Sequence, residues 1–391
     1  MNDWTAVSVL PNIELNEPID GELAALVPRD DARVRALSGA HPNLRMFLGR
    51  FKDAFGARLR PAVLLARANA PSTVFTVDAI ASFRDAISIA VVTRARAWEL
   101  AKPRGHRVTY SNAFSFYPWM LDKNHEDLIG NTPAFLGIHD VKAFHGQSSP
   151  EISRHTLSAY DIDRPLIDAL IARWHVRYGG GKPARWPEIA LFRSLNMANQ
   201  AALIPAGSDT TLYDVGRSIA LWVSAFEILA HPGTGKSGLA SVYGLLEKVG
   251  WQDRRTKARR YCAYAPGGKT GARRSLACRL YGEIYRARND FLHGNPVFSN
   301  RLAVRGSGRG LFECAAPLYR MALTGFLPLA WTAPMPDMND ARAFGRYIAD
   351  RMVFHDYQKT VEEGLLALRS NAQPIERRQR RAAAAHCPSR T

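Results

Sequence analysis

The chain has few cysteines and no long apolar run, and both shortages narrow its class. Its 391 residues include four widely spaced cysteines, with no Cys-x-x-Cys pair and no metal-ligand spacing with histidine. No apolar stretch approaches the roughly 20 residues that a membrane span requires. Residues 1–4 lack the basic and apolar segments of a secretion signal. We therefore expect a cytoplasmic protein with free thiols and no membrane partner.

Acidic side chains are also scarce. The chain has 52 Lys and Arg against 35 Asp and Glu, a net charge of +17, which favours a polyanionic partner. Residues 1–31 carry seven acids against Arg29, a balance of −6, whereas residues 251–280 carry nine bases against Asp253, a balance of +8. The basic stretch is expected to bind RNA, with rings stacking on bases. These residues are Arg254, Arg255, Lys257, Arg259, Arg260, Lys269, Arg273, Arg274, Tyr261 and Tyr264. A flexible basic loop is an equally good interpretation.

The first half of the chain mixes helical and strand-like patterns. Residues 1–30 are acidic and contain several prolines, so we expect a loose or extended lead-in. Apolar residues recur at helical spacing from 76 to 100, from about 163 to 177 and from 187 to 204. Between them, residues 113–117 resemble a strand. We expect residues 1–205 to form a mixed α/β region that senses or positions a partner.

The second half is almost wholly helical in pattern. Helices are expected at about 209–230, 237–250, 272–293, 315–331 and 338–369, and their short links predict a helical bundle over residues 208–370. Residues 371–391 are basic and alanine-rich and are expected to be a disordered tail. The overall fold class is therefore α+β, with an all-α bundle after a mixed region.

The end of the helix expected at 272–293 carries the most complete set of reactive side chains. Arg288 and Asn289 are followed by His293 and Gly294. A guanidinium can fork onto a phosphate and stabilise the charge of a pentavalent transition state. Asn289 can orient a hydroxyl or phosphate oxygen, and a histidine can take up or deliver a proton near pH 7. The set predicts phosphodiester chemistry without a metal or cofactor.

The same residues also fit a structural role. Arginine and histidine in a last turn favour the negative end of the helix dipole, Gly294 is the expected residue after the cap, and Pro296 blocks continuation. Five residues at about 100° each place Arg288 and His293 about 140° apart on an ideal helix. Both face one cleft only if the helix ends or unwinds near His293. One imidazole cannot easily take and deliver a proton at once, so a site shared by two symmetric copies is attractive.

Residues 280–294, read as Leu-Tyr-Gly-Glu-Ile-Tyr-Arg-Ala-Arg-Asn-Asp-Phe-Leu-His-Gly, resemble the signature helix of HEPN domains (higher eukaryotes and prokaryotes nucleotide-binding), in the Apea-like branch. Residues 218–229 and 316–323 resemble flanking segments, so that the resemblance covers roughly 208–335. It implies a helical bundle, usually dimeric. Many members are metal-independent endoribonucleases with toxin–antitoxin or anti-phage roles.

Carried over to this sequence, the resemblance makes Arg288 and His293 the catalytic pair and Asn289 the residue that positions substrate. Glu227 and Asp290 are supporting residues, with Glu227 expected to pair with Arg288, although a surface glutamate is the commoner explanation. The implied reaction is RNA cleavage by 2′-hydroxyl transesterification. The substrate could be tRNA, and the trigger a regulatory protein or a phage component. The alternative is an inactive HEPN module that dimerises and binds nucleic acid with a steep salt dependence.

Two competing patterns receive simpler interpretations. Residues 230–237 fit a relaxed phosphate loop, but such a loop follows a strand, and residues 215–229 have helical spacing. We expect a helix–loop–helix link in which Ser237 caps the second helix. His125, His139 and His145 fit no common metal-ligand spacing, so we expect no metal site.

Overall fold

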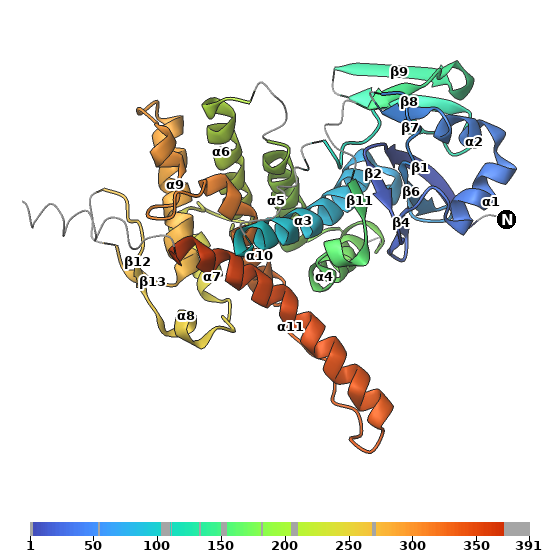
Figure 1. Ribbon diagram of the computed structural model, residues 1–391. Coiled ribbons are helices and arrows are strands. Elements are labelled where there is room, and N and C mark those ends of the chain that lie inside the picture. Colours follow the sequence, from blue (N-terminus) through green and yellow to red (C-terminus); the bar gives the residue numbers. More distant parts are fainter. Residues whose placement is uncertain are drawn as a thin grey trace, which may run out of the picture.

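The computed structural model describes residues 3–53, 55–102, 110, 112–132, 134–149, 155–180, 183–204, 210–267 and 271–370. These residues form an α+β fold in which a β region lies at one end of a larger helical assembly (Figure 1). The predicted fold class is confirmed. Lys269 and the basic tail at 371–391 lie outside the described residues.

A sheet of four antiparallel strands is the centre of the β region. The order is β1 (Trp4–Leu10), β6 (Ala62–Arg67), β4 (Ala24–Val27) and β3 (Ile19–Asp20). Alternate residues of a strand point to opposite faces. In β6, Leu64 belongs to the large core shared with the helices, whereas Val63 and Leu65 belong to a second, smaller core. The sheet is therefore buried on both faces.

The structure corrects the loose lead-in expected for residues 1–30. Leu10 and Val27 are fully buried, at 0% exposure, and the segment supplies β1, β3 and β4. Pro11 and Pro18 lie between strands, so they interrupt the apolar pattern without interrupting the sheet. The strand expected at 113–117 is also wrong, because these residues form turns and irregular backbone.

Short elements complete the β region. Two helices cover the face of the sheet that carries the smaller core. Further short strands lie outside the central sheet and form two parallel pairs and one antiparallel sheet of three strands. The helices are α1 (Ala32–Ala40) and α2 (Pro42–Leu48). The strands are β2 (Ile13–Leu15) with β11 (His155–Leu157), β5 (Phe51–Asp53) with β10 (Gln147–Ser149), and the sheet β7 (Met120–Leu121), β8 (Asp127–Thr132) and β9 (Phe135–Asp140).

The helical assembly is built around one central helix, α3 (Val77–Ala101), which packs against four others. The remaining helices are α4 (Arg164–Tyr178), α5 (Trp186–Ala202), α6 (Leu212–Leu229), α7 (Leu239–Glu247), α8 (Arg254–Ala258), α9 (Leu276–Leu292), α10 (Leu311–Phe326) and α11 (Ala341–Ser370). None of the described helices is both long and apolar enough to cross a membrane. One half of α11 extends away from the body of the protein (Figure 1).

Helices from both sides of residue 205 share the large core. α3 contacts α10 and α11, and α5 contacts α6. A Cβ on Gly364 of α11 would lie 2.6 Å from the carbonyl oxygen of Ala97 on α3, so these two backbones are in close contact. The division into a region of residues 1–205 and a domain of 208–370 stays a prediction.

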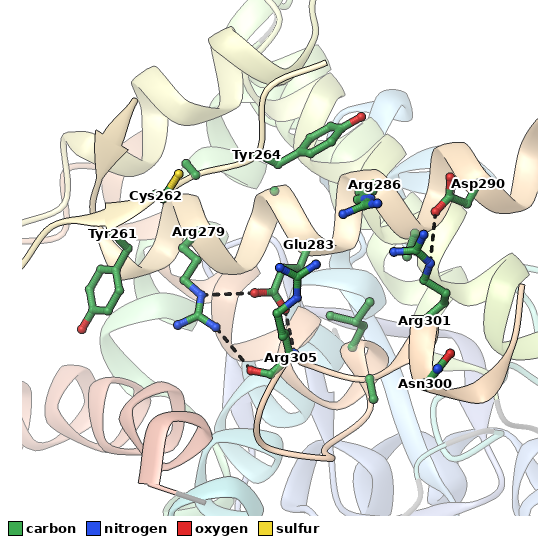
Figure 2. Close-up of a pocket in the computed structure, with 15 residues that line it drawn as sticks. Tyr261, Cys262, Tyr264, Arg279, Glu283, Arg286, Asp290, Asn300, Arg301 and Arg305 are labelled. Atoms are coloured by element: carbon green, nitrogen blue, oxygen red, sulfur yellow. Dashed lines mark hydrogen bonds and ion pairs between the residues drawn. The ribbon is translucent and has the colours of Figure 1, made fainter. Parts of the chain in front are cut away.

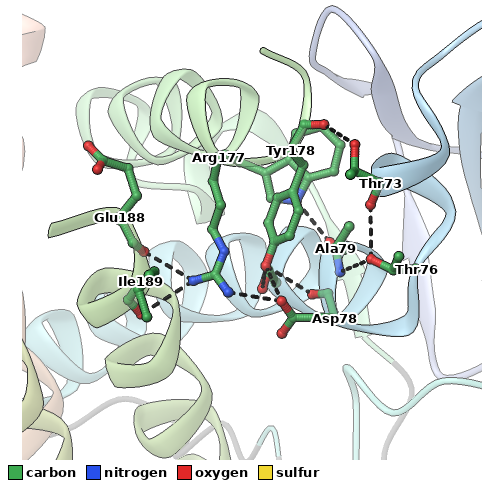
Figure 3. A network of polar contacts seen from close by, with 10 residues as sticks. Thr73, Thr76, Asp78, Ala79, Arg177, Tyr178, Glu188 and Ile189 are labelled. Carbon is green, nitrogen blue, oxygen red and sulfur yellow. Dashed lines mark hydrogen bonds and ion pairs between the residues drawn. The ribbon is translucent and has the colours of Figure 1, made fainter. Parts of the chain in front are cut away.

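A polar network joins the start of α3 to the end of α4 and the start of α5 (Figure 3). Asp78 accepts hydrogen bonds from the Tyr178 hydroxyl at 2.7 Å and from Arg177 at 2.9 Å. Arg177 also donates to the carbonyl oxygens of Glu188 and Ile189, at 3.2 and 3.3 Å. Arg177 therefore satisfies carbonyl groups of α5 while its charge is neutralised from α3.

A second polar contact lies deep in the core. Asp163 caps α4 by accepting from the Leu166 N–H at 3.2 Å. The same carboxylate accepts two hydrogen bonds from Arg320 of α10, at 2.6 and 3.2 Å. The two side chains are 1% and 3% exposed. Removal of one partner would leave an uncompensated buried charge.

Replacement of Arg320 by methionine should therefore lower the free energy of unfolding by about 3–5 kcal/mol, because Asp163 would stay buried without its cation. Chemical denaturation followed by circular dichroism measures the change. Arg346→Met, at an exposed position on α11, is the matched control and should have little effect. Equal stability of the two variants would contradict the proposed importance of the pair.

Candidate functional site

Helix α9 begins later than expected and ends where expected. Its cap is Ser275, which accepts from the Cys278 N–H at 3.4 Å. The helix does not begin at 272, because β13 (Arg273–Arg274) pairs with β12 (Tyr261–Cys262). At the other end, the Asn295 N–H donates to the Asp290 carbonyl at 3.0 Å, and the Gly294 N–H donates to the Phe291 carbonyl at 3.3 Å. With Gly294 at φ +71°, this is a Schellman motif.

Close packing of α9 on α6 sets the position of Arg288. A Cβ on Gly216 would collide with the ring of Phe291, so only glycine permits this approach. Arg288 Nη2 then lies 2.8 Å from Glu227 Oε2, and Nη1 donates to Asn289 Oδ1 at 2.9 Å. The structure thus places Glu227 against Arg288, as the sequence analysis anticipated.

The electrostatics of this pair are set by partial burial. Burial raises the pKa of the Glu227 carboxyl, and the neighbouring Arg288 opposes the rise. The side chains of Arg288 and Glu227 are 20% and 21% exposed. Arg288 donates two of its five guanidinium N–H groups to described residues. Its remaining donors are available to a ligand.

His293 lies apart from this pair. It is the C-cap of α9, with φ −87° and ψ 7°, and its N–H still donates to the Asn289 carbonyl at 3.0 Å. The helical path therefore continues to His293, and the angular separation from Arg288 of about 140° applies. The side chain is exposed, and no described residue forms a hydrogen bond or ion pair with the imidazole. In one copy, Arg288, Asn289 and Glu227 meet, and His293 stands separately.

Asp290 also lies apart from Arg288. Its carboxylate is 3.8 Å from Arg301 and accepts from the Asn295 amide at 3.3 Å. It lines a cleft of about 520 Å³ on another side of α9 (Figure 2). Asp290 therefore belongs to the wall of this cleft.

The cleft is bounded by α9, by residues 261–264 and by the segment that follows η4 (Ser299–Leu302). Four arginines and two acids line it. Arg279 pairs with Glu283 at 3.1 Å, and Glu283 also accepts the Arg305 N–H at 2.9 Å.

Two cations of the cleft, Arg286 and Arg305, form no ion pair with a described carboxylate. Arg286 is half-buried and lies with its guanidinium 6.0 Å from the centre of the Tyr264 ring. No described carboxylate pairs with it. A free cation beside an aromatic ring can bind a phosphate and a base. Arg286, Arg301 and Arg305 were not among the predicted site residues. The spacing of 279, 283, 286 and 290 places Arg286 on one helix face with other charged residues, whereas Arg301 and Arg305 follow the helix and give no such signal.

The basic residues expected to bind RNA are mostly exposed. Arg254, Arg255 and Lys257 lie on α8, and Arg259 and Arg260 follow it. Arg260 pairs with Glu247 at 3.2 Å, Arg273 is exposed, and Arg274 lies 5.0 Å from the ring centre of Tyr243. The described members thus form a cationic surface that leads to α9.

The aromatic residues of this stretch differ in access. Tyr261 is only 9% exposed and lies between Arg259 and Arg279, with ring-centre distances of 5.3 and 5.9 Å. Tyr264 is half-buried and lines the cleft. Tyr264 is therefore the better placed of the two for stacking.

The competing patterns have structural explanations. Residues 230–238 link two helices, but Ser237 is not the cap of α7; its hydroxyl donates to the Glu227 carbonyl at 3.0 Å, and Gly238 takes the cap position. His125 is buried and its Nε2 accepts the Ala6 N–H at 3.2 Å, while burial lowers the pKa of the imidazole to about 4. Within the ranges that the structure describes, no group of three or more His, Cys, Asp or Glu could hold a metal ion.

Comparison of the chain with protein-family models, with curated proteins and with solved structures finds no match. Functional inference for this protein therefore rests on its own residues. The residues that carry the HEPN resemblance lie on α6, α9 and α10, which contact one another in the bundle.

The shifted pKa of Glu227 gives a testable pH dependence. The folded protein binds this proton more tightly than the unfolded chain, so the associated stability is complete below the ordinary pKa and declines as pH rises through the folded value. Relative to Glu227→Gln, the wild-type protein should lose unfolding free energy as the pH rises above the ordinary carboxyl pKa of about 4. Denaturation at a series of pH values measures the difference.

Glu363→Gln, at an exposed position on α11, controls for the general loss of an acid. A wild-type protein that gains stability over Glu227→Gln with rising pH would show that the attraction of Arg288 outweighs the burial.

Proposed function

We propose that the protein is a cytoplasmic, metal-independent endoribonuclease of the HEPN type. The observation that supports this most directly is the state of Arg288. Glu227 and Asn289 hold the guanidinium at fixed distances of 2.8 and 2.9 Å, and the side chain remains 20% exposed. A pre-positioned cation with free donors is suited to a phosphate whose charge grows during reaction.

In the proposed reaction the 2′-hydroxyl of one nucleotide attacks the adjacent phosphorus. An imidazole of His293 takes the hydroxyl proton, the bond from phosphorus to the 5′ oxygen breaks, and a second imidazole protonates that oxygen. Arg288 stabilises the pentavalent phosphorus, and Asn289 orients its oxygens. The products carry a 2′,3′-cyclic phosphate and a 5′-hydroxyl.

Two copies are needed for this arrangement. In one copy, His293 lies about 140° around the helix from Arg288. A symmetric partner would therefore supply the second imidazole and bring a histidine close to Arg288. Apolar side chains near this end of α9 are available for such an interface: Leu212, Tyr213, Leu292 and Phe298 are 40%, 75%, 58% and 66% exposed. Exposed apolar side chains gathered in one place are typical of interaction surfaces.

The RNA would reach the site along the cationic surface. Phosphates of the strand would lie on α8 and on Arg286, with a base against Tyr264. His293 follows Arg286 by seven residues, so both lie on one stripe of the helix and the cleft leads towards the imidazole. Cleavage of tRNA, a toxin or anti-phage role and a protein trigger follow from the HEPN resemblance alone.

The separation of His293 from Arg288 favours one alternative. An inactive HEPN module would dimerise and bind nucleic acid through the same cationic surface. Its binding would fall steeply with salt, because each neutralised phosphate releases counterions. It would show no dependence on His293.

Cleavage of total bacterial RNA and tRNA in excess EDTA tests the nuclease. Wild type should cut, and Arg288→Ala or His293→Ala should reduce the rate by roughly 100-fold or more, as for loss of a charge-stabilising or proton-transfer group. Arg288→Lys keeps the charge but not the two-pronged guanidinium, so its cleavage rate should lie between those of wild type and Arg288→Ala. Circular dichroism of each variant confirms folding.

The chemistry of the ends completes this test. Cyclic phosphate and 5′-hydroxyl ends are expected, whereas 3′-hydroxyl and 5′-phosphate ends would overturn the mechanism. RNA that all variants bind alike and none cleaves would support the binding module.

Cys262 offers a probe of the RNA path. It is exposed beside the cleft, whereas Cys278 and Cys314 are buried and burial raises the pKa of both thiols, that of Cys278 to about 12. In a His293→Ala, Cys387→Ser protein, bound RNA should slow labelling of Cys262 by a thiol reagent several-fold. Arg286→Glu should remove that protection and Arg346→Glu should not. Protection that survives Arg286→Glu would exclude this path.

A further inference from the structure

The N-terminal region contains a second hollow, which is lined mainly by arginine. Its volume is about 500 Å³, and it lies between α1, α2 and the residues that precede α1 and β6. Its charged side chains are Arg29, Arg35, Arg45 and Arg60 against Asp30, a balance of +3. This excess is unexpected in a stretch of chain whose first 31 residues are acidic.

Most of these cations form no ion pair with a described acid. Arg60 pairs with Asp30 at 2.5 Å. Arg29, Arg35 and Arg45 form no hydrogen bond or ion pair through their guanidinium groups with any residue that the structure describes. Unpaired like charges around a hollow attract an anion.

The acids nearby are already engaged elsewhere. Arg33, also on α1, pairs with Asp31 at 2.9 Å and with Asp20 at 2.7 Å. These carboxylates therefore pair with Arg33, which does not line the hollow, and form no ion pair with Arg29, Arg35 or Arg45. The walls themselves are fixed, because Leu37 of α1 and Phe47 of α2 are buried in the smaller core.

The surroundings of Arg29 disfavour its charged form. It is half-buried, and burial lowers the pKa of its guanidinium, with further lowering by Arg60 and Arg58. A bound anion would relieve both the desolvation and the repulsion.

We propose that this hollow is a binding site for a compact polyphosphate, either free or as the phosphate chain of a nucleotide. Three guanidinium groups can fork onto neighbouring phosphates from different sides. The volume lies within the usual range of small-molecule sites, about 300–1,000 Å³. None of the described residues that line it is aromatic, so none of them can stack on a base. The phosphate groups are what the site recognises.

This site is separate from α9 and does not depend on the proposed nuclease activity. It gives the N-terminal region a receptor function of its own, and RNA cleavage can fail or succeed without bearing on it.

Isothermal titration calorimetry of the full chain tests the site, with inorganic tripolyphosphate as the probe and ATP in a parallel arm. We expect one site per chain. The double variant Arg29→Gln, Arg35→Gln should weaken binding roughly tenfold or more, and Arg45→Gln alone should weaken it too. The control Arg346→Gln, Arg351→Gln loses the same charge from exposed positions on α11 and should bind as wild type.

Similar affinities for ATP and tripolyphosphate would identify the phosphate chain as the recognised group. Three results would overturn the proposal: no binding by wild type, equal weakening in the control pair, or a single-stranded RNA octamer that binds more tightly than tripolyphosphate and is lost in the same variants. A melting curve for each variant separates loss of binding from loss of folding, and Arg45→Gln supplies an independent reading if the double variant is unstable.

Discussion

The buried pair of Asp163 and Arg320 is the contact on which the arrangement of the two halves depends. Asp163 caps α4, and its own N–H donates to the Ala90 carbonyl of α3 at 3.2 Å. Arg320 brings α10 to the same point. Since a charge this deep is stable only with its partner, the α4 start, α3 and α10 are fixed in one geometry. α9 packs on α10 and on α6, so the orientation of the candidate site follows from the same constraint.

Charge distribution divides the surface into regions with different chemistry. At the α9 cleft, acids pair with Arg279 and Arg301, whereas Arg286 forms no ion pair with a described acid and lies beside an aromatic ring. At the N-terminal hollow, Arg29, Arg35 and Arg45 form no ion pair with a described acid, and none of the described lining residues is aromatic. The first arrangement suits a nucleotide within a strand, and the second suits phosphate groups alone. A net charge of +17 therefore does not describe one uniform basic surface.

Local patterns in the sequence predict the helices well, because amphipathic spacing is a local property. The helices α3, α4, α5, α6 and α11 lie near their expected ranges. The errors occur where contacts between distant residues determine the structure. β1 is stable through its pairing with β6, and Arg273 and Arg274 pair in a hairpin instead of starting α9. At the site, the Glu227–Arg288 contact agrees with expectation, whereas the cleft around Arg286 depends on two segments outside α9, residues 261–264 and 300–311. Spacing along one helix cannot place those segments.

The parallel strand pairs of the β region also have a consequence for biosynthesis. Ile13 of β2 pairs with His155 of β11, and Phe51 of β5 pairs with Gln147 of β10. Contacts between such distant residues form slowly, because a long loop must close first. β2 and β5 therefore remain without these partner strands until residues 147–157 have been synthesised. During that interval the nascent chain exposes unpaired apolar strands, which is the state that chaperones bind.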